Sequence, residues 1–248
     1  MSPLFRKYRL KHRDGHDAGL ARYSAVVIRL HFEVQQFLKA LNQYVADVIY
    51  GRTWVRFQQI CHHLQIWMTT SLAQDSKNFS ATGCPSLIDF HDYHLSVWDT
   101  LLYMSLQRGS SRLLQKILAS IFEVILRFHK QVEADLVQLE SPGPTITIIS
   151  PKLPGPGPGS SLSSIAARTE QTEGLHEEFR IELQAFYQQL GNAALRRPEM
   201  EPFLPESIRT CLQDAPHLLE NGPRESVDYH PYLDLLLHLD FSQYYKFI

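Results

Sequence analysis

SRLLQKILASIFEVILRFHKQVEADLVQL, residues 111–139, carries apolar side chains at intervals of three and four residues. These side chains are Leu114, Ile117, Ile121, Ile125, Phe128, Val132 and Leu136. Such intervals place side chains on one face of an α-helix, whereas a β-strand would alternate. The stretch therefore predicts a long amphipathic helix. We expect Ser110 or Ser111 to cap its start, because a serine oxygen accepts a hydrogen bond from a first-turn N–H.

The same period recurs before and after this stretch. Upstream it comprises Val27, Leu30, Val34, Phe37, Leu38, Leu41, Tyr44, Val45, Val48 and Ile49. We expect that helix to stop near Gly51, and Thr53 to cap a second helix. The second helix would present Trp54, Phe57, Ile60, Leu64 and Trp67. Further downstream the period is carried by Phe179, Leu183, Phe186 and Leu190. No segment of comparable length alternates like a strand, so the predicted fold class is an all-α helical bundle.

Residues 141–174 differ in composition from the helical segments, because they are dense in Pro, Gly and Ser. Such a composition buries too little apolar surface to offset the loss of chain entropy. We predict a flexible insertion there, and the run TITII within it is only weak evidence for a short strand. The expected organisation is a helical segment over 1–140, the insertion over 141–174, and a final helix with a tail over 175–248, completing the same domain.

Global composition gives no sign of a nucleic-acid or membrane partner. The chain has 24 Lys and Arg against 26 Asp and Glu, so its charge is nearly balanced. No apolar run reaches the ~20 residues of a membrane span, and the basic N-terminus lacks the apolar region of a secretory signal. The three cysteines, Cys61, Cys84 and Cys211, are odd in number and irregularly spaced, which indicates reduced thiols. We expect a cytoplasmic protein.

Residues 89–106, DFHDYHLSVWDTLLYMSL, pose the question of catalysis. His91 and His94 lie beside Asp89 and Asp92, which suits a metal site, an acid–base cluster or the first turn of a helix. We favour the helix start, with Asp89 as N-cap and Asp92 near the positive end of the helix dipole. A zinc site needs three or four ligands, and none of the common catalytic or nucleotide-binding motifs occurs. We therefore expect no catalytic, cofactor-binding or metal-binding residue, and no enzyme.

Three stretches resemble the gamma-tubulin complex proteins, the spindle-pole-body component family. Residues 89–129 resemble a family pattern of His-x-x-Tyr/His-Leu, a helix, a brief break and a Leu-rich helix. Residues 27–59 resemble a family helix at His31, Phe32, Phe37, Leu41, Tyr44, Val48, Ile49 and Trp54. The ending resembles the family's ending at Leu235, Leu236, Leu239, Asp240, Phe241, Tyr244 and Tyr245. All three occur in the family's order and at fitting distances.

The resemblance implies a non-enzymatic scaffold without cofactors. Its partners would be gamma-tubulin, other gamma-tubulin complex proteins and, through the complex, microtubule minus ends. It would support microtubule nucleation at microtubule-organising centres or the mitotic spindle pole, in the cytoskeleton. The matching region is the later part of the family's C-terminal gamma-tubulin-binding domain, its second GRIP motif. The family's N-terminal half is absent, and we expect a truncated sequence.

Candidate interface residues come from the polar faces of the helices. Arginine binds carboxylates in a bidentate manner, so arginine clusters suit contacts with acidic partners. The candidate partner-binding residues are Arg52, Arg56, Arg108, Arg112, Tyr244 and Tyr245. By contrast, we expect the core to contain Phe37, Leu41, Trp54 and Trp98. Two alternatives stay open: an unrelated helical protein-interaction module, and a metal-dependent hydrolase that uses His91 and His94.

Overall fold

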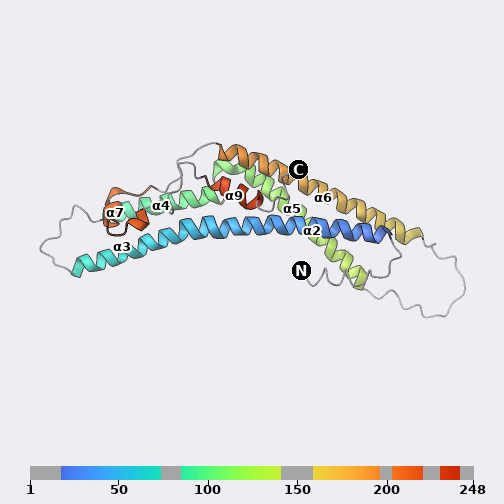
Figure 1. Ribbon diagram of the computed structural model, residues 1–248, viewed down its shortest axis with the longest axis horizontal. Helices are drawn as coiled ribbons and strands as arrows, with labels where there is room; N and C mark the ends of the chain where they lie inside the picture. Colours follow the sequence, from blue (N-terminus) through green and yellow to red (C-terminus); the bar gives the residue numbers. More distant parts are fainter. Residues whose placement is uncertain (1–17, 74–84, 141–158, 196–202, 220–229, 241–248) are drawn as a thin grey trace. The chain divides into compact units, whose positions relative to one another are not determined.

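The computed structural model describes residues 18–73, 85–140, 159–195, 203–219 and 230–240, and none of these forms a β-strand. The predicted all-α class is confirmed (Figure 1). The elements are α2 (Ala18–Tyr44), the π-helix η1 (Val45–Trp54), α3 (Val55–Ala73), α4 (Leu87–Met104), the 3-10 helix η3 (Gly109–Ser111), α5 (Arg112–Glu140), α6 (Gly159–Ala194), α7 (Glu206–Cys211), α8 (Pro216–Leu219) and α9 (Pro231–Asp240).

The described chain divides into two compact units, and the divisions fall within helices. The first unit contains residues 18–38, 117–140 and 159–186. The second contains residues 39–73, 85–116, 187–195, 203–219 and 230–240. The expected boundaries at 140/141 and 174/175 do not coincide with this division.

The core of the first unit is built by the apolar faces of α2, α5 and α6. The ring of Phe37 meets the rings of Phe179 and Phe186 edge to face, with centroids 6.2 and 6.3 Å apart. Edge-to-face pairs of this kind add to the free energy gained from burial. The buried apolar residues around them are Val27, Leu30, Val34, Ile121, Val124, Phe128, Leu175 and Leu183. Most of the predicted periodic positions of α2 are therefore buried, whereas Leu38 is 37% exposed.

Two carboxylates are also buried in the first unit, and each has partners from a second helix. Asp135 of α5 is 5% exposed; it accepts a hydrogen bond from the Tyr23 hydroxyl and lies 2.8 Å from Arg168 Nη1. Glu33 of α2 is 1% exposed and lies 2.9 Å from His176 Nε2 of α6. Removing one partner of such a pair would leave a buried charge uncompensated. These pairs therefore fix which residues of α2, α5 and α6 face one another.

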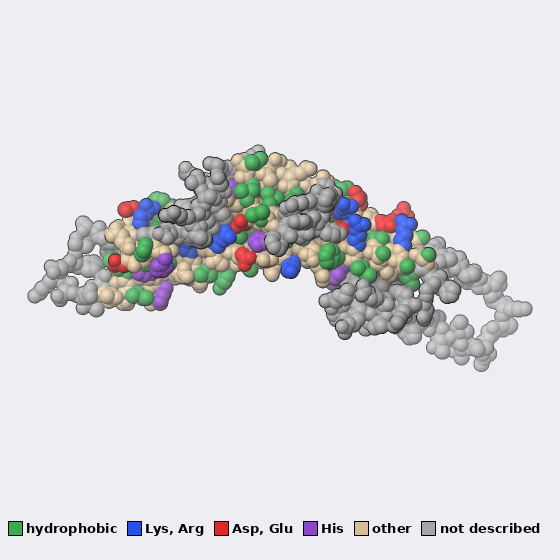
Figure 2. Space-filling view, viewed as in Figure 1, with side chains coloured by type: hydrophobic (Ala, Val, Ile, Leu, Met, Phe, Trp, Pro, Cys, Tyr) green, Lys and Arg blue, Asp and Glu red, His purple; other side chains and the backbone are tan. Residues whose placement is uncertain are grey.

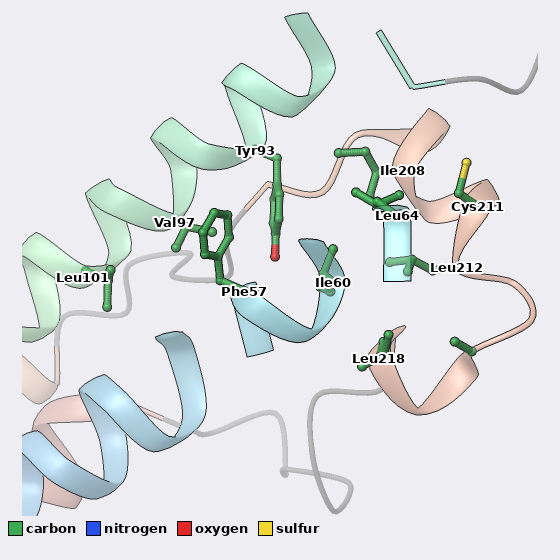
Figure 3. Packing of buried hydrophobic residues seen from close by; sticks show 11 residues of the cluster. Phe57, Ile60, Leu64, Tyr93, Val97, Leu101, Ile208, Cys211, Leu212 and Leu218 are labelled. Carbon is green, nitrogen blue, oxygen red and sulfur yellow. The ribbon is translucent and has the colours of Figure 1, made fainter. Parts of the chain in front are cut away.

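The second unit is centred on the packing of α3 against α4. Phe57 lies 5.8 Å from Tyr93, and Trp54 lies 6.4 Å from Trp98, measured between ring centroids. Trp54, at the end of η1, comes before Phe57 in the chain, whereas its partner Trp98 comes after Tyr93. The two helical segments therefore run antiparallel. Figure 3 shows how α7, α8 and the turn between them add Ile208, Cys211, Leu212 and Leu218 to this cluster.

The expected helix stop at Gly51 and the expected Thr53 cap are wrong. The helix continues through both residues as the π-helix η1. The Thr53 hydroxyl lies 3.4 Å from the carbonyl oxygen of Val48 and 3.2 Å from Met104 Sδ, so it caps nothing. A Cβ added to Gly51 would lie 3.1 Å from the Ala46 carbonyl oxygen. Glycine therefore suits the wider π-turn here instead of ending the helix.

The expected Asp89 N-cap is also wrong, because Ser86 holds that position. The Asp89 N–H donates to Ser86 Oγ at 3.0 Å, and the Ser86 N–H donates to Asp89 Oδ2 at 2.9 Å. This reciprocal arrangement is a capping box, with the acid at the third helical position. Hydrogen bonds from the Ser86 backbone and side chain hold the pKa of Asp89 below its usual range.

Neither Ser110 nor Ser111 caps α5. Both lie in η3, the 3-10 helix that leads directly into α5. The N-cap residue of η3 is Arg108, whose side chain makes no capping hydrogen bond. Ser111 Oγ instead lies 2.7 Å from the hydroxyl of Tyr232 in α9. The role of Ser111 is therefore determined by Tyr232, which lies far away in the sequence.

The predicted flexible insertion is too long at its second end. Helix α6 begins at Gly159, and within residues 159–174 Thr169 and Thr172 are buried. Thr172 accepts a hydrogen bond from Gln131 Nε2 of α5 at 2.8 Å. Residues 141–158, including TITII, lie outside the described residues. In the predicted tail, α7, α8 and α9 are additional helices, and Leu235 and Leu239 of α9 are buried. Phe241 lies outside the described residues.

The corrected boundary generates a paired prediction. Replacing residues 141–158 with a short Gly/Ser linker should change the melting temperature little, because altering a loop costs little free energy. Replacing residues 141–174 should lower it markedly, because this removes Thr169, Thr172 and the Arg168–Asp135 ion pair. Thermal unfolding followed by circular dichroism measures both. Equal melting temperatures for the two variants would contradict the assignment of residues 159–174 to the folded unit.

A second prediction concerns alkaline pH. Burial raises the pKa of Tyr93 to about 12, from an ordinary value of 10.0. The unfolded chain therefore ionises first, so this contribution to stability is present below pH 10 and is lost as the pH rises from 10 to 12. Between about pH 9 and 11 the loss is about 1.4 kcal/mol, the value of one pKa unit. Urea unfolding measures the free energy of unfolding of the wild type and of Tyr93→Phe at both pH values. The decrease from the lower to the higher pH should be smaller in Tyr93→Phe by about 1.4 kcal/mol. An equal decrease in the two proteins would contradict the effect of burial on Tyr93.

Candidate partner-binding surface

Helix α4 is apolar on two opposite faces. Its inner face, with Tyr93 and Val97, is buried in the core of the second unit. Away from that face, side chains that are 44–71% exposed lie at helical intervals, with Trp98 at the edge next to Trp54. They are Ile88, Leu95, Trp98 and Leu102. We call these four residues together with His91 the outer face of α4. An exposed stripe of this kind indicates a contact surface, since single exposed apolar residues would be scattered.

Trp98 was expected in the core but is 45% exposed. Its indole N–H donates to His94 Nε2 at 2.7 Å, and the His94 ring lies 5.6 Å from the Phe57 ring. These contacts hold Trp98 in place at the edge of the aromatic cluster. Partly exposed, well-supported tryptophans are frequent energetic centres of protein interfaces. The sequence did contain a signal for this surface, the seven-residue spacing of Ile88, Leu95 and Leu102 beside Trp98. The sequence analysis did not use it.

His91 and His94, the histidines of the possible metal site, have different partners. His94 is engaged by Trp98, while His91 Nδ1 lies 3.4 Å from Asp92 Oδ1 at the surface. Among the described residues, no group of three or more His, Cys, Asp and Glu side chains is placed to hold a metal ion.

Two of the predicted interface arginines make contacts within the second unit. Arg52 Nη1 lies 2.7 Å from Asp234 Oδ2 of α9, and Arg56 Nη2 donates to the Leu218 carbonyl oxygen of α8 at 3.2 Å. Both connect the α3 region to the short C-terminal helices. This structural role leaves their prediction as partner contacts untested.

The other two arginines, Arg108 and Arg112, lie at the turn between α4 and α5, which we call the arginine corner. Arg108 is half exposed and lies 3.2 Å from Asp99 Oδ2, and Arg112 is exposed. Because an exposed ion pair contributes little to stability, a partner carboxylate can replace Asp99 at small cost. Tyr244 and Tyr245, the remaining predicted contacts, lie outside the described residues.

Helix α9 is fastened beside the arginine corner by a buried polar cluster. The Tyr232 hydroxyl donates to the Tyr103 carbonyl oxygen at 3.1 Å, and the Tyr103 hydroxyl lies 3.3 Å from His230 Nε2. The two tyrosine rings stack with centroids 4.7 Å apart. Burial raises the pKa of both hydroxyls above the ordinary tyrosine value. The sequence reasoning missed this cluster, whose members lie far apart in the chain.

On the one face drawn in Figure 2, the described residues form no dominant patch of one charge. On the face shown in Figure 2, Lys and Arg side chains lie beside Asp and Glu side chains over the described residues. A 740 Å³ cavity in the first unit is lined by Arg127 and Arg168, but each already contacts a carboxylate, of Glu178 and Asp135 respectively. Among the described residues, the outer face of α4 and the arginine corner are therefore the candidate contact surfaces.

A family model described as gamma tubulin complex component C-terminal matches residues 5–245. No curated protein and no solved structure matches the chain. None of the described helices is long and apolar enough to cross a membrane.

The α9 cluster yields a stability prediction. Tyr232→Phe removes a hydroxyl that contacts Ser111 Oγ and the Tyr103 carbonyl, leaving buried polar atoms without that partner. We expect a loss of about 1–3 kcal/mol in the free energy of unfolding. Tyr50→Phe is the matched control, because Tyr50 is 58% exposed and such changes stay within about 0.5 kcal/mol. Equal urea midpoints for the two variants would show that the cluster does not hold α9.

Proposed function

The chain belongs to the gamma tubulin complex component family, and on that premise we propose that it is a scaffold subunit that binds gamma-tubulin and supports microtubule nucleation. The observation that carries the proposal is the family match over residues 5–245, nearly the whole chain. Its partners would include other gamma-tubulin complex proteins and, through the complex, microtubule minus ends. Its location would be the cytoskeleton at microtubule-organising centres or spindle poles.

We propose the arginine corner as the gamma-tubulin contact, together with Tyr244 and Tyr245. Arg108 and Arg112 project from a short turn between two long helices, α4 and α5. A rigid mount of this kind lowers the entropy lost when a side chain is fixed against a partner. The guanidinium groups suit carboxylates on the partner. Arg52 and Arg56, which already hold α9 and α8, would contribute by supporting this region of the second unit.

A scaffold role agrees with the chemistry of the described side chains. The hydrolase alternative relied on His91 and His94, yet His94 Nε2 accepts the Trp98 indole N–H. The buried Glu33 and Asp135 are likewise occupied, by His176 and Arg168. These groups hold helices together. The alternative of an unrelated helical interaction module would be favoured if gamma-tubulin does not bind the chain at all.

The test is a pull-down of purified gamma-tubulin on the full chain and on Arg108→Glu/Arg112→Glu. Exposed charge pairs contribute about 0.2–1 kcal/mol each, and reversal adds repulsion, so we expect affinity to fall roughly tenfold. The control is Arg127→Glu/Arg209→Glu, two exposed arginines elsewhere, which changes the net charge equally. Retained binding by the first variant, or equal loss in both, would contradict the arginine corner as the contact.

A further inference from the structure

We infer that the outer face of α4 is a second docking surface, and that it binds an amphipathic α-helix with Lys or Arg along one edge, supplied by another protein. This surface goes beyond the proposed gamma-tubulin contact at the arginine corner. Three features of α4 carry the inference: the spacing of its exposed apolar side chains, the use of its other face by the core, and the charge along one edge.

The spacing is that of a helix–helix seam. Ile88, Leu95 and Leu102 follow one another at intervals of seven residues, and His91 and Trp98 fill the alternate positions between them. This is the heptad pattern with which one helix packs along another. At 1.5 Å per residue the seam is about 21 Å long, which matches a partner helix of roughly fifteen residues. A flat or globular partner would not require such a narrow stripe.

The opposite face of α4 already lies in the core, where Tyr93 is 3% and Val97 2% exposed. Ile88 and Leu95 are 71% and 52% exposed on the other side. One apolar stripe is enough to bury a helix against its core, so a second apolar stripe on the same helix indicates a second contact. Rotating α4 to hide the outer face would expose the core face, so α4 cannot bury both faces against the described core by turning about its axis.

The negative charge along one edge of α4 indicates which charge the partner helix should carry. Asp92 and Asp99 are seven residues apart, directly beside the apolar seam, and the side chains of both are 55% exposed. Asp92 lies 3.4 Å from His91 and Asp99 lies 3.2 Å from Arg108. Because exposed ion pairs of this kind contribute little free energy, both carboxylates can exchange these partners for a cation on a bound helix. In a pair of packed helices, residues that flank the seam face the flanking residues of the partner helix. Their charges determine which partner helix binds. Lys or Arg on the partner would therefore be favoured, and Glu or Asp disfavoured.

The α4 helix of a second copy of this chain would not supply the Lys or Arg side chains that the acidic edge favours. In an antiparallel pair of α4 helices the acidic edges would face each other. In a parallel pair the acidic edge would face the other edge, and α4 contains no Lys or Arg. The complement must come from a different helix.

The test uses two synthetic amphipathic peptides with the same Leu seam, one flanked by Lys and the other by Glu. Fluorescence anisotropy measures their binding to the full 248-residue chain. We expect the Lys peptide to bind about tenfold more tightly, since two flanking positions change from attraction to repulsion. Asp92→Lys/Asp99→Lys should reverse that preference. Leu95→Asp should abolish binding of both peptides with unchanged helicity, because Leu95 is exposed in the free chain.

The matched control is Leu126→Asp in α5, since Leu126 is 60% exposed and lies in the first unit; it should bind the Lys peptide as the wild type does. The inference is overturned if neither peptide binds, if both bind equally, or if the charge reversal leaves the preference unchanged. It is also overturned if the wild type is a dimer that Leu95→Asp converts to a monomer. Binding that appears only after residues 74–84 are replaced by a Gly/Ser linker would identify the chain's own segment as the occupant.

Discussion

The antiparallel packing of α3 against α4 is the interaction on which the second unit depends. Phe57 contacts both Tyr93 and His94, and the short helices α7 and α8 complete the same cluster. Loss of one buried aromatic side chain of this kind costs about 3–5 kcal/mol, a large fraction of the roughly 5–15 kcal/mol that keeps a domain folded. This packing also fixes the rotation of α4 about its axis. It thereby determines which side chains face outward.

Two surfaces of different chemistry follow from that rotation. The arginine corner presents cations, whereas the outer face of α4 presents an apolar seam with an acidic edge. The Arg108–Asp99 ion pair, 3.2 Å between Nη2 and Oδ2, connects the two surfaces. A protein that assembles others needs separate, rigidly mounted contacts more than a catalytic pocket. Buried polar groups, such as the Tyr103–Tyr232 cluster, serve that rigidity by fixing α9 to the α4–α5 region.

Features set by local periodicity were predictable from the sequence. The apolar spacing identified α2, α5 and α6 and buried residues such as Phe37 and Phe179, because burying one face dominates helix stability. Features set by distant contacts were not. Nothing local shows that Gly51 lies within a π-helix, or that Ser111 bonds to Tyr232 instead of capping α5. The composition of residues 159–174 concealed Thr172, whose partner Gln131 lies on α5. Of the candidate contacts, Arg108 and Arg112 were named from the sequence and stay a prediction, whereas the exposure of Trp98 was not expected.

Hydrogen–deuterium exchange of the full chain, alone and with gamma-tubulin, tests the central claim most directly, because it locates a contact without any substitution. The account predicts slower exchange in residues 105–114, at the arginine corner, and unchanged exchange in α6 of the first unit around Phe179. Local protection of this kind reports a site covered by the partner. Unchanged exchange throughout the chain at saturating gamma-tubulin, or protection confined to the first unit, would contradict it.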